Sequence, residues 1–295
     1  MSSRSASPLL PVGSLLLSVV SFQLGTALAK QLFDTIGAQG ATAIRLGLGA
    51  LILWAIRQPW RRLAGRRDWA PLVGYGLTIG VMNLCFYMAL RTIPLGIAVA
   101  IDFLGPLAIA LAGSRRAIDF VWVVLAVGGL ALLLPFRAPM QSLDPVGVMF
   151  ALAAAVCWAI YILLGRRAGA AFGGDAVALG SAIGALVAVP AGIAHAGSAL
   201  FSPSMLPFAL GVAVLSSALP YSLEMHALTR LPARIVGILV STEPAIAALA
   251  GLVFLDEHLS ALQWLAIALI IAASIGSVLG ARQPVESTQT VEPAP

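Results

Sequence analysis

"ALTRLPARIVGILVSTEPAIAALAG", residues 227–251, is a second copy of "ALRTIPLGIAVAIDFLGPLAIALAG", residues 89–113. Nine of the 25 aligned positions are identical, including both prolines of each stretch and the closing Ala-Leu-Ala-Gly. The repeat continues outside these stretches, because an offset of 138 residues aligns Asp119 with Glu257. Two related halves are therefore expected in one chain.

The composition is that of an integral membrane protein. Of the 295 residues, 60% are hydrophobic and 10% are charged, and the mean hydropathy is +0.99, whereas a soluble domain has about 25% charged residues. Apolar runs reach the ~20 residues that a helix needs to cross a ~30 Å hydrocarbon core. A backbone in lipid must satisfy its own hydrogen bonds, so runs of this length predict helices and not ~10-residue barrel strands.

Windows of about 19 residues predict ten membrane-spanning helices joined by short loops, at 10–29, 39–57, 69–90, 94–113, 118–136, 146–164, 176–194, 205–227, 232–254 and 261–280. Five fall in each repeat half, 9–137 and 146–281, between tails 1–8 and 282–295, and the second tail is predicted to be disordered. An odd number of helices makes the second half enter the membrane from the opposite face. The expected fold is therefore an all-α membrane protein of two inverted five-helix repeats, typical of secondary transporters.

The positive charges predict the orientation. With a cytoplasmic N-terminus, 13 Lys and Arg residues fall in inside segments and three fall outside (Lys30, Arg91 and Arg137), while Arg45 lies within the second helix. This asymmetry follows the positive-inside rule and places both termini in the cytoplasm. The N-terminus also fits a cleavable signal peptide ending near 27–29, but the repeat argues against cleavage because the first helix has a counterpart in the second half.

Charged side chains inside the predicted helices are the first site candidates. Asp102 lies eight residues into the fourth helix and Glu243 eleven residues into the ninth, which places both near the bilayer middle at 1.5 Å per residue. A charge at this depth costs ~3 kcal/mol or more, so it must face a partner, protein or a wet cavity. Arg45 would pair with an acid or meet a substrate carboxylate. A static internal ion pair, or an arginine extended toward the headgroups, is the alternative.

Prolines accompany the buried acids. Pro244 follows Glu243 directly and removes a helix hydrogen bond, which frees a carbonyl and adds a flexible point. Pro106 is its counterpart in the fourth helix, and inverted-repeat transporters hold their substrate where such helices are interrupted. Simple kinking for helix packing is the alternative interpretation.

Other polar and aromatic residues of the same helices are candidates for a substrate and proton pathway. Their hydroxyl, amide and ring groups could orient a small ligand in an apolar pocket, or could only bind helix to helix. These candidates are Asn83 and Tyr87 in the third helix, Trp158 and Tyr161 in the sixth, and Ser217, Tyr221 and Glu224 in the eighth.

Other function classes lack support. The sequence has no nucleophile elbow, metal-ligand cluster or phosphate-binding loop, so we expect no enzyme, bound metal, cofactor or ATP-driven pump. Cys85 and Cys157 lie in apolar runs without redox or metal spacing. The net charge of +5 comes from arginines that mark topology, so nucleic acid is not an expected partner.

At these residues the two halves resemble tandem EamA domains of the drug/metabolite transporter superfamily. The resemblance covers about 10–277, and in the second half it is carried by Tyr221, Glu224, Ala227, Leu228, Pro232, Ala233, Glu243, Pro244 and Glu257. "IPLGIAVAIDFLGPLAIAL" and "LSSALPYSLEMHALTRLPAR" look more narrowly like bacterial exporters of threonine and homoserine. The resemblance implies an inner-membrane exporter of small amino acids that exchanges substrate for protons across the lipid bilayer. Export of another metabolite or drug on the same scaffold is the alternative.

Overall fold

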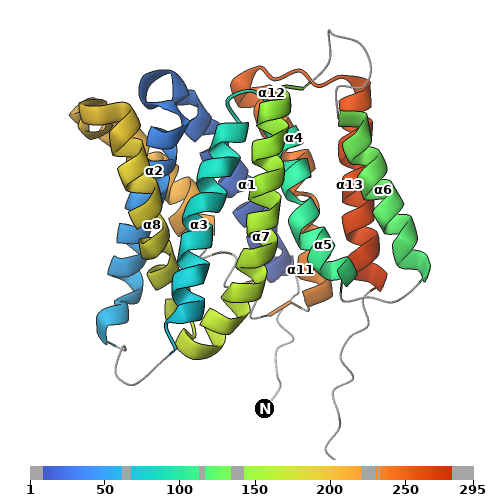
Figure 1. The fold of residues 1–295 in the computed structure, drawn as a ribbon, viewed down its shortest axis with the longest axis horizontal. Coiled ribbons are helices and arrows are strands. Elements are labelled where there is room, and N and C mark those ends of the chain that lie inside the picture. The colour runs from blue at the N-terminus through green and yellow to red at the C-terminus, as the bar shows by residue number, and fades with distance from the viewer. Residues whose placement is uncertain are drawn as a thin grey trace, which may run out of the picture.

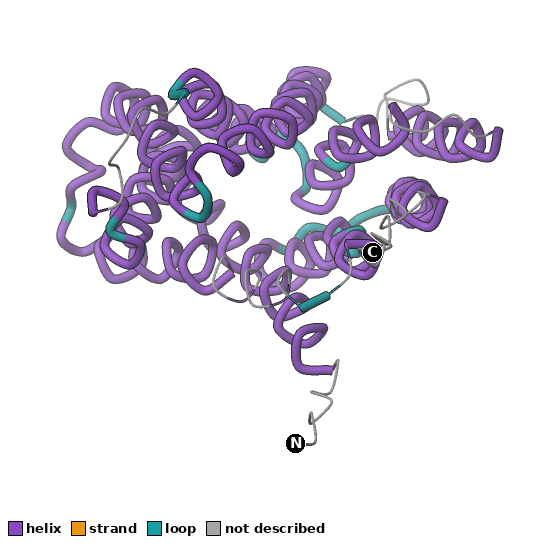
Figure 2. The backbone as a smooth tube through the Cα atoms, turned by 90° about the horizontal axis from the view of Figure 1, so that it is seen from below, coloured by secondary structure: helices purple, strands orange, loops and turns teal. Residues whose placement is uncertain are grey.

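The protein is an all-helical bundle in the part of the chain that the structure describes. The structure is a computed structural model, which describes residues 9–61, 68–112, 117–133, 143–220, 223, 227, 230–231 and 233–280. The helices run roughly side by side along the bundle (Figure 1), and the end-on view shows helices and loops but no strand in these residues (Figure 2). This confirms the expected class of helical membrane protein.

The first half of the chain forms helices up to residue 133. They are α1 (Leu9–Gln31), α2 (Phe33–Arg57), η1 (Pro59–Arg61), α3 (Ala70–Ala89), α4 (Leu95–Asp102), α5 (Leu104–Ala112) and α6 (Ala117–Leu133).

The second half begins at residue 145. Its helices are α7 (Pro145–Phe172), α8 (Asp175–Ala196), η2 (Gly197–Phe201), η3 (Pro203–Met205), α9 (Leu206–Ala213), η4 (Val214–Ala218), α11 (Ala233–Val240), α12 (Glu243–Leu255) and α13 (Ala261–Gly280).

Six helices are long and apolar enough to cross a membrane by length and composition, and four apolar helices are shorter. The six are Leu9–Gln31, Phe33–Arg61, Ala70–Ala89, Pro145–Phe172, Asp175–Phe201 and Ile235–Leu255, and the shorter four are Leu95–Ile109, Phe120–Leu132, Pro203–Ser217 and Ala261–Ser277. All ten coincide with a predicted helix. The second one begins at Phe33 instead of 39, because Gly37 adopts φ 68° and joins a first turn to the main helix across a kink, a conformation that only glycine adopts without strain.

The two prolines mark interrupted helices, as predicted. The fourth predicted helix is divided at Phe103 into α4 and α5, with Pro106 in the first turn of α5. The ninth is divided at Ser241 and Thr242, and Pro244 lies in the first turn of α12. Proline suits a first turn because the N–H that it lacks has no partner there in any case.

Helices of the first half pack against helices of the second. The main pairs are α2 with α8, α3 with α7, α4 with α12, and α6 with α13, and Figure 1 shows α6 and α13 side by side at one edge. Gly96 of α4 allows the closest approach, because a Cβ there would lie 2.5 Å from the Cβ of Ala248 in α12. Small residues at crossings are typical of membrane helices, since lipid removes the hydrophobic drive to associate.

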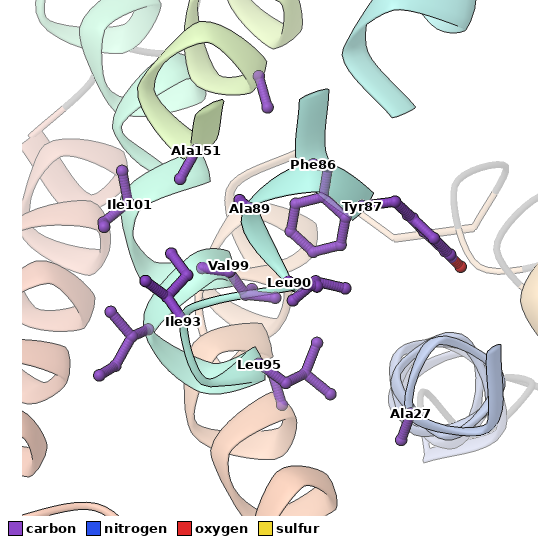
Figure 3. Close-up of a cluster of buried hydrophobic side chains, with 14 of the residues drawn as sticks. Ala27, Phe86, Tyr87, Ala89, Leu90, Ile93, Leu95, Val99, Ile101 and Ala151 are labelled. Carbon is purple, nitrogen blue, oxygen red and sulfur yellow. The ribbon is translucent and has the colours of Figure 1, made fainter. Parts of the chain in front are cut away.

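The largest core cluster surrounds the connection between α3 and α4. Leu90, Ile93 and Leu95 are fully buried there (Figure 3). At the same end of the bundle Asp144 caps α7, accepting a hydrogen bond from the Val146 N–H at 3.2 Å. A hydrogen bond from the Thr92 side chain, with that from Val146, lowers the pKa of the Asp144 carboxyl. The cap thus fixes the start of α7 against the α3–α4 connection.

Candidate functional site

A cavity of about 220 Å³ lies among α1, α2, α3, α4, α7 and the α11–α12 junction. This volume corresponds to roughly seven water molecules at ~30 Å³ each, the size of a small polar metabolite and below the ~300 Å³ of drug-sized pockets. Six of the predicted site residues line it: Arg45, Asn83, Asp102, Trp158, Tyr161 and Glu243. The structure therefore brings together side chains that lie up to 198 positions apart in the sequence.

Arg45 is the most constrained of these residues. Its side chain is 4% exposed, and its Nη1 donates a 2.8 Å hydrogen bond to the Asn83 Oδ1. The Asn83 Nδ2 donates to the Ile79 carbonyl at 2.9 Å, which turns the amide oxygen toward Arg45. The guanidinium carbon also lies 4.6 Å from the centre of the Phe22 ring and 5.5 Å from that of Tyr87, within the range of cation–π attraction.

The Arg45 charge is held by neutral groups. Among the described residues, its printed partners are the Asn83 amide and two rings, and its Nε has no hydrogen-bonding partner. The expected ion pair with Asp102 or Glu243 is not seen in this part of the chain. Arg45 can therefore offer an N–H group and a net positive charge to an anion in the cavity.

Both acids lie where a helix is interrupted. Asp102 is the last residue of α4 and Glu243 the first residue of α12. Asp102 is buried, and within the described residues its Oδ1 accepts no hydrogen bond. The cavity is thus lined by two carboxyl groups, one from each half of the chain, and by one guanidinium.

Two aromatic residues of α7 form one wall. The Trp158 ring meets Phe103, the residue at the α4–α5 break, edge-on at 5.0 Å. Tyr161 stacks on Tyr75 of α3 at 4.9 Å, and their hydroxyl oxygens are 3.3 Å apart. These contacts fix the wall beside Asp102, and both aromatic side chains line the cavity as predicted.

Three predicted residues lie outside the cavity lining. Tyr87 is fully buried beside Arg45 and packs against Phe33, with centroids 5.8 Å apart, and Figure 3 shows its hydroxyl turned away from Leu90. Ser217 faces α2, where a Cβ on Gly49 would lie 2.8 Å from its hydroxyl oxygen. Pro244 is buried beside Glu243.

Two further predicted residues, Tyr221 and Glu224, lie outside the residues that the structure describes. Their place in a pathway therefore stays a prediction. Their neighbour Pro220, at the end of the described part of this helix, lines the cavity.

Gln23 was missed by the sequence analysis. It lies on α1, is 1% exposed and lines the cavity. The available signal was a primary amide in the middle of an apolar helix, which is also common in simple helix packing.

A larger cavity of about 780 Å³ lies between α2, α8 and α9. Its lining side chains are apolar apart from Ser202 and the Trp54 indole, whose N–H already donates to the Ala178 carbonyl. Such a lining offers few groups to orient a polar ligand, so the smaller cavity is the better candidate site. Within the described chain, no group of three or more His, Cys, Asp or Glu side chains could hold a metal ion.

An ion pair closes the end of the bundle at which α1 finishes. Lys30 of α1 and Glu257, in the connection between α12 and α13, form an ion pair at 2.6 Å, and the second Glu257 oxygen accepts from the Leu95 N–H at 2.7 Å. Both side chains are less than one-fifth exposed. This connection crosses the upper end of the bundle in Figure 1. The Lys30–Glu257–Leu95 latch therefore joins helices from both halves of the chain above the cavity.

Comparison with known proteins identifies the family. The profile of the EamA-like transporter family matches residues 9–134 and again residues 145–279. The chain belongs to the EamA-like transporter family. This EamA-like transporter is thus a multi-pass membrane protein of a transporter family and not an enzyme, as the resemblance implied.

Close relatives of this EamA-like transporter carry a specific name. It is 54% identical over 282 residues to the threonine/homoserine exporter RhtA of Salmonella typhimurium strain SL1344, covering 96% of each chain. It is also 54% identical over 274 residues to RhtA of Escherichia coli strain K12, covering 93% of each. A protein solved by crystallography shares the fold with a TM-score of 0.58 at 20% identity, over 90% of this chain and 96% of the other.

Proposed function

We propose that this protein exports small amino acids, threonine and homoserine in particular, across the bacterial inner membrane. Relatives that share 54% of its residues over nearly the whole chain are named as exporters of these two compounds. The cavity supports the proposal, because its volume suits a small metabolite and its lining combines one cation with two acids.

Arg45 is the observation that carries the proposal. A buried guanidinium with only neutral partners among the described residues is costly in the membrane unless an anion joins it. The carboxylate of an amino acid would supply that anion through charge-assisted hydrogen bonds. The ammonium group of the same zwitterion needs an acid, which Asp102 or Glu243 would provide. One cation and one acid on opposite walls thus select an amino acid over a simple anion or cation.

The proposed topology is ten membrane spans in two inverted halves, with both termini in the cytoplasm. The family profile matches twice, once in each half, and the ten apolar helices divide five and five at residue 145. Helix pairs that an inverted repeat would relate to themselves, α2 with α8 and α6 with α13, pack together. The distribution of arginines, 13 inside and three outside, sets the orientation.

Transport would proceed by alternating access, with the Lys30–Glu257–Leu95 latch closing the outer side. Gln23 in the cavity and Lys30 in the latch are seven residues apart on α1, roughly 10 Å along the helix. By the repeat alignment, the counterparts of the latch residues are Arg166 and Asp119 near the inner ends of α7 and α6. These two would pair when the inner side closes, so that one ion pair forms as the other breaks.

Proton exchange is the proposed energy source. Export against a gradient needs a group that releases substrate on one side and takes a proton in its place. Asp102 and Glu243 are titratable groups that line the same cavity as Arg45, so protonation of either would compete with binding of the substrate ammonium.

Amino-acid efflux tests the proposed function. Cells that overproduce the protein are preloaded with threonine, homoserine or phenylalanine, and loss is followed with and without a proton uncoupler. We expect faster loss of threonine and homoserine, abolished by the uncoupler, and unchanged loss of phenylalanine. Unchanged loss of all three would refute amino-acid export and leave the transporter fold with a different metabolite.

A further inference from the structure

Gln23 carries a buried amide that the packing of the helices does not use. It is 1% exposed and lines the cavity. Neither its Nε2 nor its Oε1 has a hydrogen-bonding partner within the residues described. Buried donors and acceptors are costly to leave unpaired and are almost always satisfied in native proteins, so this amide calls for a partner.

The other polar side chains of α1 show that packing alone does not explain Gln23. Ser18, Ser21 and Thr26 donate hydrogen bonds to backbone carbonyls at 2.9, 2.7 and 2.9 Å. Hydroxyls that stabilise a membrane helix or its contacts are thus satisfied on this helix. Gln23 differs from them because its side chain faces the cavity.

The neighbouring polar groups of the cavity are already occupied. Asn83 uses its oxygen for Arg45 and its nitrogen for the Ile79 carbonyl, and Ser18 donates to the Pro220 carbonyl. In the proposed function Arg45 and one acid hold the two charged groups of an amino acid. The Gln23 amide is then available for the substrate side chain, on the helix whose Phe22 ring already contacts Arg45.

We propose that Gln23 is the specificity-determining residue that binds the side-chain hydroxyl of the transported amino acid. This inference rests on the proposed amino-acid export. A primary amide both donates and accepts, and a hydroxyl accepts and donates in return. Threonine and homoserine carry hydroxyls one carbon apart along the side chain, and the two rotatable bonds beyond the Gln23 Cβ would let one amide reach either position.

Transport of threonine compared with valine is the test, because valine has a methyl group where threonine has its hydroxyl and is otherwise similar in shape. The purified full-length protein is reconstituted in liposomes, and uptake of each amino acid is measured by counterflow. Sites that hydrogen-bond a hydroxyl discriminate by several orders of magnitude, whereas apolar pockets reach only ~10²-fold. We therefore expect Gln23→Met to reduce the threonine-to-valine ratio of transport at least ~10-fold, with valine transport retained.

Gln39→Met is the matched control. Gln39 lies on α2, is partly buried and does not line the cavity, so its substitution should leave the ratio unchanged. If Gln23→Met does not reach the membrane, Gln23→Asn withdraws the amide by one methylene and should lower the ratio in the same direction.

The outcomes separate this inference from the proposed function. Threonine transport by the wild type with an unchanged ratio in both Gln23 variants would overturn the role of Gln23. An equal loss of threonine and valine transport would also overturn it, because a residue that binds only the hydroxyl leaves valine unaffected. No transport of either amino acid by the wild type would instead refute amino-acid export itself, and with it this inference.

Discussion

Neutralising Glu257 should open the outer side of the protein. In the latch the carboxylate pairs with the Lys30 ammonium at 2.6 Å and accepts from the Leu95 N–H at 2.7 Å. Glu257→Gln keeps a hydrogen-bond acceptor but removes the charge from both contacts. Charge-assisted hydrogen bonds contribute about 1.5–3 kcal/mol and neutral ones about 0.5–1.5 kcal/mol. Both side chains keep some contact with solvent, at 19% and 13% exposure, so a net loss of about 1–2 kcal/mol is expected.

This loss corresponds to an increase of about 5- to 30-fold in the ratio of outward-open to outward-closed protein, since every 1.4 kcal/mol is a factor of ten. Val99 lines the cavity and is 4% exposed, so its reactivity as a cysteine reports access from outside. With Cys85 and Cys157 replaced by serine, Val99→Cys is labelled on intact cells by a membrane-impermeant maleimide. The rate of labelling should rise in proportion to the open fraction.

Asp256→Asn is the matched control, because it removes a charge from the same connection. Its carboxylate is 93% exposed and contacts only His258 among the described residues, so the labelling rate should stay at the wild-type value. Reversing the pair with Lys30→Glu and Glu257→Lys together should restore closure only in part, because the new lysine cannot accept from the Leu95 N–H. An unchanged labelling rate in Glu257→Gln would refute the latch.

Three further substitutions test the site and the packing. Arg45→Gln should raise the apparent KM for threonine about 10- to 150-fold, because charged hydrogen bonds of about 1.5–3 kcal/mol to the substrate are lost; an unchanged KM in counterflow would remove Arg45 from the site. Glu243→Gln should abolish proton-driven efflux at normal expression, and wild-type efflux would exclude Glu243 as the coupling group. Gly96→Ala should lower the free energy of unfolding by about 1–3 kcal/mol through overpacking, because its Cβ would lie 2.5 Å from that of Ala248, whereas Gly128→Ala, with nothing within 4 Å, should not; equal thermal stability of the two variants would contradict the packing.

Charged residues in apolar runs could be placed from the sequence. Asp102, Glu243 and Arg45 are each expensive in lipid, so burial toward a common cavity is the one arrangement that satisfies all three. The inverted alignment also placed both acids near the middle of pseudo-equivalent helices, and the structure brings them into one lining. The interruptions at Phe103 and Ser241–Thr242 follow the prolines for the same local reason.

Side-chain direction was harder to predict, because it depends on helix geometry that the sequence pattern assumes to be regular. Ser217 was assigned to a polar face by counting back along an ideal helix, but Val214–Ala218 is a π-helical turn, whose wider turn breaks the 3.6-residue register. Tyr87 shares a face with Asn83 yet packs beside Arg45 and not in the cavity lining. Gln23 was missed because an amide in an apolar helix looks the same whether it binds a neighbouring helix or a ligand.

Coupling of threonine movement to proton movement tests the central claim most directly. Liposomes containing the purified protein and a pH-sensitive dye are loaded with threonine and diluted into threonine-free buffer at equal pH, with the membrane potential clamped. If the protein exchanges threonine for protons at the cavity, threonine leaves, the lumen acidifies, and neither occurs with Glu243→Gln. Threonine efflux without acidification would contradict proton exchange, and no efflux at all would contradict threonine export.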